Sequence, residues 1–93
     1  MARELHVAHI LVKNEKDAKA IKDKVLRGEN FAQLAKKHSE CPSGSEGGDL
    51  HWVNPGMMVE PFDKAIFAAK KGDVLGPVKT RFGFHIIKIL EER

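Results

Sequence analysis

Alternating apolar and polar positions open the chain and predict its first strand. Between residues 5 and 12 the side chains divide into two sets by alternation, and both sets are partly apolar (Leu5, Val7, His9, Leu11 and His6, Ala8, Ile10, Val12). Because successive side chains of a strand point to opposite faces, a strand that is apolar on both faces must be covered on both. We therefore expect a central strand.

Two helices are predicted next from apolar spacing and from the polar residues that precede them. Asn14 is an N-cap candidate, and Ala18, Ile21 and Val25 recur at helical spacing until Gly28, which predicts a helix over residues 15–27. Asn30 then caps a shorter helix that reaches about His38, with Gln33 at the position of a capping box. Two helices thus follow one strand.

The second half of the chain combines turn-forming residues with shorter apolar patterns. Residues 39–48 are rich in Ser, Gly and Pro and predict a mobile loop, and Asn54-Pro55-Gly56 predicts a turn. Apolar positions from Val59 to Ala69 predict a third helix that Gly72 stops. The remaining segments read as three strands, the last two joined by a tight turn at residues 81–83 (residues 49–53, 74–80 and 84–90).

The order β-α-α-β-α-β-β predicts an α+β fold with an antiparallel or mixed sheet of about four strands. A chain of 93 residues is expected to form one domain, residues 1–93, and we expect a monomer. Cys41 is the only cysteine, which favours a reducing, cytoplasmic compartment, and neither a signal peptide nor a membrane span is visible. The net charge of +3 is spread over mixed-sign helices, so we expect neither nucleic acid nor a membrane as partner.

Histidines are the first candidates for chemistry. His6 and His9 are three residues apart on a strand and so point to opposite faces, which argues against a shared metal; we expect no metal and no cofactor. His9 and His85 each stand among apolar residues of a predicted strand. Two buried imidazoles on neighbouring strands can satisfy each other when their tautomers are complementary, with Thr80 as a third member.

Cys41 allows two interpretations. In the polar loop it is either an incidental thiol or a reactive one, and with His9 or His85 and Asp49 it could form the site of a cysteine hydrolase. No local sequence signature supports the hydrolase. The glycine-rich residues 43–48 lack the lysine and the spacing of a phosphate-binding loop, which excludes a nucleotide site of that kind.

Several segments, taken in order, resemble the parvulin family of peptidyl-prolyl cis/trans isomerases over nearly the whole chain. They are HILVK at residues 9–13, FAQLA at 31–35, SECPSG at 39–44, GGDL at 47–50, GMMVEPF at 56–62, GPVKT at 76–80 and FGFHIIK at 82–88.

The resemblance implies the parvulin (FKBP-like) fold, a mainly antiparallel four-stranded sheet surrounded by helices, and a shallow apolar pocket for proline. It implies substrate-binding positions at Leu50, Met58, Phe62 and Phe82, and catalytic positions at His9, Cys41, Thr80 and His85. The implied activity is isomerisation of Xaa-Pro bonds in unfolded or flexible client polypeptides, by a non-covalent mechanism that assists folding.

Two departures from the family pattern bear on specificity. The family commonly continues Gly-Asp-Leu with Gly and an aromatic pair, whereas His51-Trp52-Val53 follows here. Phosphate-directed parvulins carry an arginine-rich loop after the first strand, whereas residues 13–16 turn at once into a helix, so we expect no phosphate specificity. A binding module that holds proline segments in the same groove without turnover is the remaining alternative.

Overall fold

The computed structural model of the chain describes residues 3–93, and it confirms the predicted order of elements. Eight elements follow one another: β1 (Leu5–Val12), α1 (Glu15–Leu26), α2 (Phe31–His38), the 3-10 helix η1 (Pro42–Glu46), β2 (Asp49–Val53), α3 (Glu60–Phe67), β3 (Val74–Thr80) and β4 (Gly83–Glu92). None of these helices combines the length and the apolar character that a membrane crossing needs.

The four strands form one sheet in the order β2-β1-β4-β3, and every neighbouring pair is antiparallel. The prediction that β1 is a central strand is confirmed. Leu11 lies opposite His85 on β4, and His9 lies opposite Ile87. His9 and His85 are therefore diagonal neighbours, and alternation places both side chains on the same face of the sheet.

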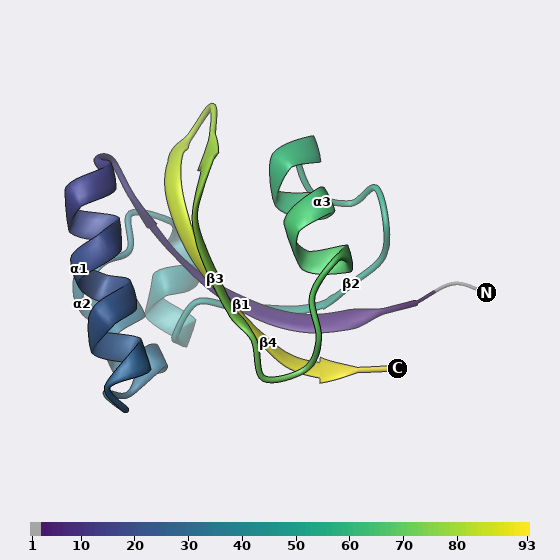
Figure 1. Ribbon diagram of the computed structural model, residues 1–93, viewed down its shortest axis with the longest axis horizontal. Helices are drawn as coiled ribbons and strands as arrows, with labels where there is room; N and C mark the ends of the chain where they lie inside the picture. Colours follow the sequence, from purple (N-terminus) through teal and green to yellow (C-terminus); the bar gives the residue numbers. More distant parts are fainter. Residues whose placement is uncertain (1–2) are drawn as a thin grey trace.

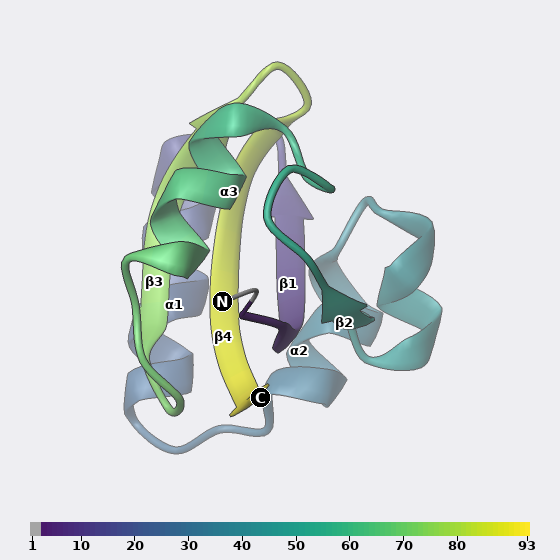
Figure 2. The same ribbon diagram turned by 90° about the vertical axis from the view of Figure 1, so that its right-hand side faces the viewer.

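Helices cover both faces of the sheet, as the two apolar faces of β1 require. Figures 1 and 2 show α1 and α2 on one side and α3 on the other. Ala8 and Ile10 pack with α1 and α2, whereas Leu5 and Val7 pack with Phe62 and other residues of α3. Two separate apolar clusters, one on each side of the sheet, make up the core.

The polar residues predicted to cap the first two helices do so. Asn14 Oδ1 accepts a hydrogen bond of 2.8 Å from the backbone N–H of Asp17, and Asn30 Oδ1 accepts one of 2.9 Å from Gln33. Such caps supply partners for N–H groups that the first helical turn leaves unpaired. The first helix ends at Leu26 with Arg27 as its cap, one residue earlier than predicted.

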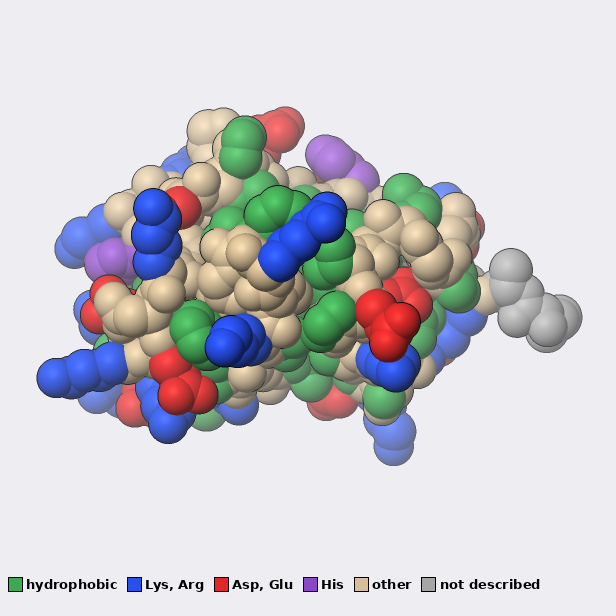
Figure 3. All heavy atoms as spheres, turned by 90° about the horizontal axis from the view of Figure 1, so that it is seen from above, with side chains coloured by type: hydrophobic (Ala, Val, Ile, Leu, Met, Phe, Trp, Pro, Cys, Tyr) green, Lys and Arg blue, Asp and Glu red, His purple; other side chains and the backbone are tan. Residues whose placement is uncertain are grey.

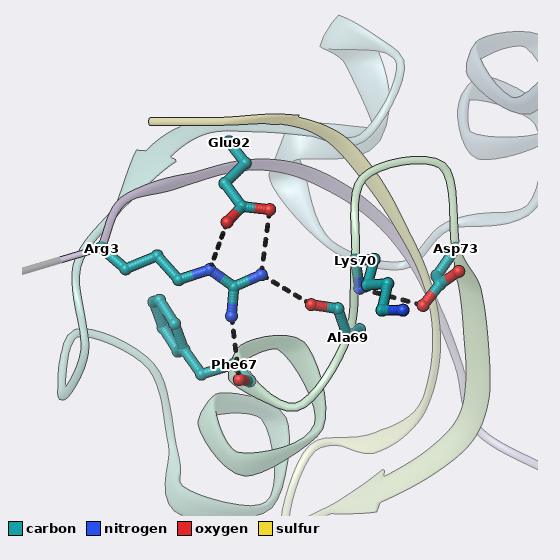
Figure 4. Close-up of polar contacts among 6 residues, drawn as sticks. All are labelled: Arg3, Phe67, Ala69, Lys70, Asp73 and Glu92. Carbon is teal, nitrogen blue, oxygen red and sulfur yellow. Dashed lines mark hydrogen bonds and ion pairs between the residues drawn. The ribbon is translucent and has the colours of Figure 1, made fainter.

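The third helix is shorter than predicted: it ends at Phe67, and Gly72 lies beyond it. The reason is a long-range contact, because the guanidinium of Arg3 donates to the carbonyl oxygens of Phe67 and Ala69 at 3.0 and 2.7 Å (Figure 4). The same guanidinium binds the carboxylate of Glu92 through two of its nitrogens. Arg3 thus fixes the end of α3 to the end of β4.

The segment predicted to be a loop, residues 39–48, contains η1 and folds tightly onto the sheet. Its last residue, Gly48, has a φ of +81°, and a β-carbon there would lie 2.2 Å from the carbonyl oxygen of His9. The carbonyl of Gly48 in turn accepts a hydrogen bond from the backbone N–H of His9 at 2.9 Å. Only glycine permits this approach, which holds the loop beside β1.

Candidate functional site

A cavity of about 460 Å³ opens on the α3 face of the sheet, between α3, the β3–β4 turn and the segment around η1. Most of its wall is apolar and the rest comes from two histidines and the start of η1: Leu11, Leu50, Met57, Met58, Val59, Phe62 and Phe82, with His9, His85, Glu40, Cys41 and Pro42. Viewed from above, hydrophobic side chains gather in the middle of the molecular surface, with charged side chains of both signs around and between them (Figure 3). The cavity suits a small apolar group.

The two histidines predicted to pair lie together beneath this cavity. Their Nδ1 atoms are 2.9 Å apart, their rings are stacked with centroids 5.1 Å apart, and both residues are buried. On the far side of His85, Nε2 lies 2.7 Å from the hydroxyl of Thr80. On the far side of His9, Nε2 lies 3.2 Å from the hydroxyl of Ser43, which donates to Cys41 Sγ at 3.3 Å.

These contacts form one chain of hydrogen bonds, and its direction follows from Thr80. The Thr80 Oγ1 atom already accepts a hydrogen bond from the backbone N–H of Phe82 at 3.1 Å. If it also accepted from His85, the Thr80 hydroxyl hydrogen would have no acceptor among residues 3–93. We therefore assign Thr80 as donor to His85 Nε2, His85 Nδ1 as donor to His9, and His9 Nε2 as donor to Ser43, so that each hydrogen finds an acceptor.

Both imidazoles are neutral near neutral pH. Burial, together with a smaller repulsion from the nearby His85, lowers the pKa of His9 from 6.5 to about 4. Burial also lowers the pKa of His85. A proton added to either ring would place a donor against a donor at the Nδ1–Nδ1 contact, or an unpaired charge in the core.

Phe62 joins the cavity to the histidine pair. Its side chain is fully buried, and its ring meets His9 and His85 edge to face, with centroids 5.6 and 5.2 Å away. Edge-to-face contacts of this kind add to the energy of burial alone. Phe62 is therefore at once a core residue, as its spacing along α3 predicts, and the floor of the cavity.

The remaining predicted substrate-binding positions line the walls. Leu50 comes from β2, Met58 from the segment before α3, and Phe82 from the turn before β4, where it is 54% exposed. Met57, 59% exposed, also lines the cavity. All eight predicted site residues are thus at the cavity or in contact with a residue that lines it, Thr80 being the one that reaches it through His85.

The arrangement does not assemble the cysteine hydrolase considered from the sequence. Asp49, the carboxylate of that scheme, receives a 2.7 Å hydrogen bond from His6 and another of 2.7 Å from the backbone N–H of His51. Among the residues that the structure describes, the Cys41 sulfur is linked to His9 through the hydroxyl of Ser43 and not by a direct hydrogen bond. The hydrolase interpretation was wrong in its geometry, because Asp49 orients neither His9 nor His85.

Two features of the site region were missed in the sequence. Ser43 links Cys41 to His9, but a single serine in a glycine-rich loop carries no periodic signal. His6, Asp49 and His51 come together on the opposite face, where the ligand atoms of the three side chains lie within 4.8 Å of one another. The sequence contained one signal for this cluster: His51 stands where the parvulin pattern commonly has glycine.

Comparison with known proteins gives a consistent result over nearly the whole chain. Residues 9–91 match the rotamase family model, described as the PPIC-type PPIase domain. The chain is 49% identical over 90 residues to the foldase protein PrsA of Geobacillus kaustophilus, which covers 96% of this chain and 32% of that protein. It therefore spans about a third of the length of that curated relative.

Solved structures agree with this match. The solution structure of NmPin, the parvulin of Nitrosopumilus maritimus, superimposes with a TM-score of 0.87 at 39% identity and covers 98% of this chain and 99% of its own. A chain from Campylobacter jejuni, one of the SurA-like chaperones PEB4 and the periplasmic protein Cj1289, has a TM-score of 0.92 at 38% identity. It covers 100% of this chain and 40% of its own.

Proposed function

The chain belongs to the PPIC-type peptidyl-prolyl isomerase family, the parvulins, and from this premise we propose that it catalyses cis/trans isomerisation of Xaa-Pro bonds in flexible polypeptides. The observation that carries the proposal is the apolar cavity floored by Phe62 above a neutral histidine pair, with the Cys41 thiol in its wall. These residues all lie within the segment that matches the family.

The physical task is to lower a rotation barrier of about 18–20 kcal/mol that arises from the partial double-bond character of the amide. The pyrrolidine ring enters the cavity between Met58, Phe82 and the Phe62 floor, with Leu50 as a side wall. The apolar surroundings desolvate the amide as it twists and loses resonance. No covalent bond to the protein forms.

The polar residues act on the carbonyl of the twisting bond and on the shape of the cavity. Cys41 provides an electrostatic contact near that carbonyl, and the hydrogen bond from Ser43 orients its sulfur. His9 and His85 line the cavity beneath the ring. Thr80 is a positioning residue that fixes the tautomer of His85.

The proposed substrates carry no phosphate before proline. Glu40 lies in the cavity wall, and an acidic side chain there repels a phosphate group. The connection from β1 to α1 consists of Lys13 and Asn14 alone, which leaves no arginine-rich loop. Lys13 itself lies 3.7 Å from the Glu40 carboxylate, so its charge is partly offset.

The proposed partners are proline-containing segments of unfolded client proteins, because isomerisation of these bonds is slow enough to limit folding. The name foldase borne by the Geobacillus relative supports this role. Residues 1–93 are proposed to form one domain that acts as a monomer, and the match to NmPin, which covers 98% of this chain and 99% of its own, supports the domain assignment. The cytoplasmic location stays a prediction from the single cysteine. The Campylobacter relatives, which include a periplasmic protein, favour a location outside the cytoplasm instead.

Exchange NMR on short Xaa-Pro peptides with catalytic amounts of the protein tests the proposal. Faster cis/trans exchange than in the protein-free sample, with no cleavage of the peptide, is the expected result. Peptides that bind but exchange at the uncatalysed rate would make the chain a proline-binding module and overturn the catalytic proposal. A set of peptides with Glu, phosphoserine, Leu and Ala before proline measures the specificity, and a preference for phosphoserine would contradict the argument from Glu40.

A further inference from the structure

A cluster of three potential metal ligands lies on the sheet face opposite the cavity. His6 of β1 belongs to the alternate set that includes Ala8, so its side chain points away from Val7 and the α3 side. His6 Nε2 lies 2.7 Å from Asp49 Oδ1, and His51 Nδ1 lies 3.7 Å from Asp49 Oδ2. One ligand atom from each of the three side chains lies within 4.8 Å of the others.

A β-bulge creates this cluster. His6 pairs with Trp52 and Ala8 with Asp49, so β2 has one residue more than β1 between these two pairs. Within the bulge, His51 has a φ of +61°, the left-handed region in which glycine is the usual residue of such a bulge. A histidine at this position is strained, and an observed strain of this kind motivates a functional explanation.

The side chains of the two residues in the bulge, Leu50 and His51, lie on different faces of the sheet. Leu50 lines the cavity, whereas the imidazole of His51 lies on the side of Asp49 and His6. The His6 and His51 rings are nearly parallel, at 7° to each other, with centroids 6.3 Å apart. The side chain of His51 is 68% exposed, so it has room to turn its Nδ1 toward a shared ion.

The carboxylate between the two rings already faces both histidines, because it accepts hydrogen bonds of 2.7 Å from the His6 ring and 2.7 Å from the His51 backbone N–H. Two imidazoles and one carboxylate are ligands that first-row divalent transition metals prefer, while Mg²⁺ and Ca²⁺ prefer oxygen ligands alone. The described residues here offer one oxygen-donor side chain, which does not make a calcium site.

We propose that His6 Nε2, the Asp49 carboxylate and His51 Nδ1 bind one Zn²⁺ ion, with water in the remaining position. Three protein ligands with a fourth position for water is a common arrangement for zinc. The ion joins β1 to β2 directly behind Leu50, so it stabilises the strand that carries one wall of the cavity. The proposal concerns ion binding and does not depend on the isomerase activity.

Calorimetric titration with ZnCl₂ and thermal melts test the proposal, in protein carrying Cys41→Ser so that the thiol does not compete. The expected result is one bound Zn²⁺ per chain and a melting temperature that rises with zinc but not with MgCl₂. His51→Gly is the decisive variant, because glycine suits the φ of this position and the fold is retained without the ligand. Since loss of an outer-sphere partner weakens metal sites about 10–100-fold, loss of this direct ligand should weaken zinc binding by at least about 100-fold.

Two further variants are needed: Asp49→Asn removes a second ligand, and His38→Gln is a control. The first removes the charged ligand at nearly constant size and should abolish the zinc-dependent rise in melting temperature, whereas His38 lies outside the cluster and its variant should bind zinc as the parent does. Substoichiometric NiCl₂ should broaden the NMR signals of His6, Asp49 and His51 before those of His9 or His85. No saturable zinc binding, or equal affinity in His51→Gly and the parent, would overturn the proposal.

Discussion

The Nδ1 atoms of His9 and His85 face each other at 2.9 Å, so only one of these two buried nitrogens carries a hydrogen. The contact joins the two central strands, β1 and β4, directly beneath the cavity. This hydrogen bond is lost when the acceptor ring, His9, takes up a proton on Nδ1, because both nitrogens then carry a hydrogen. The cavity floor therefore depends on a group whose charge changes within an accessible range of pH.

The first prediction is a loss of stability in mild acid. The folded-state pKa of His9 is about 4 against 6.5 in the unfolded chain, so between these values the unfolded state binds a proton that the folded state refuses. The stabilisation is fully present above pH 6.5 and is lost as the pH falls through about 4. A shift of this size corresponds to roughly 3 kcal/mol, and the lowered pKa of His85 adds in the same direction.

Urea denaturation at a series of pH values measures this effect. The free energy of unfolding should fall by about 1.4 kcal/mol per pH unit for each proton taken up within the window. His9→Asn should lower stability at pH 7 and flatten this slope by about one proton. A slope that is unchanged in His9→Asn would mean that other groups cause the acid lability.

The second prediction distinguishes a role of Phe82 in substrate binding from a role in the stability of the fold. Phe82 is 54% exposed, so Phe82→Ala should change the free energy of unfolding by less than about 0.5 kcal/mol. In the proposed mode of substrate binding Phe82 closes the cavity over the proline ring, so the same variant should lower kcat/KM by at least about tenfold. Leu26→Ala is the matched control, an apolar residue 63% exposed on α1 and outside the cavity, and it should keep full activity.

Periodicity was enough to predict the elements, because burial on one or both faces leaves a repeating pattern in the residues. The two faces of β1 were predicted correctly for this reason, and the caps at Asn14 and Asn30 because asparagine is a preferred N-cap residue. The end of α3 was not, because the contact from Arg3 to Phe67 joins residues far apart in sequence. Spacing along one helix carries no information about such a partner.

The residues of the site also fall into two groups, those whose positions follow from the sequence pattern and those whose positions do not. The meeting of His9, His85 and Thr80 was predictable, since each lies on the inner face of a strand and needs a polar partner there. Ser43 and His51 were not. Their positions depend on a 3-10 helix and a β-bulge, which shift side chains out of the regular repeat that sequence analysis uses.

The third prediction concerns the thiol. If Cys41 acts electrostatically, Cys41→Ser should keep substantial isomerase activity, because a hydroxyl can also take a hydrogen bond from Ser43. Ser43→Ala should lower activity without unfolding the domain, since it separates Cys41 from His9. Exchange NMR gives the rates, and mass spectrometry after incubation with peptide should find no adduct on Cys41. A trapped acyl adduct would exclude the non-covalent mechanism.

The fourth prediction compares two glycines that share a backbone conformation but differ in their surroundings. Gly48 and Gly56 have φ values of +81° and +89°, yet a β-carbon at Gly48 would lie 2.2 Å from the His9 carbonyl oxygen, while one at Gly56 meets nothing within 4 Å. Gly56→Ala should therefore cost about 1–2 kcal/mol, from left-handed strain alone. Gly48→Ala should cost roughly 2–5 kcal/mol, because overpacking against β1 is added.

Urea denaturation gives the free energy of unfolding of each variant. Because both carry the same left-handed strain, the difference between the two values measures the cost of the close approach of residue 48 to His9. Gly48→Ala should also lower isomerase activity under conditions where the variant is still folded. Any shift of residue 48 moves η1, which Cys41 directly precedes, and the His9 backbone to which Gly48 is hydrogen-bonded. Gly56→Ala should keep its activity. Equal destabilisation by the two substitutions would show that β1 and the loop can separate without loss, and that the packing of residue 48 on His9 does not hold the cavity in shape.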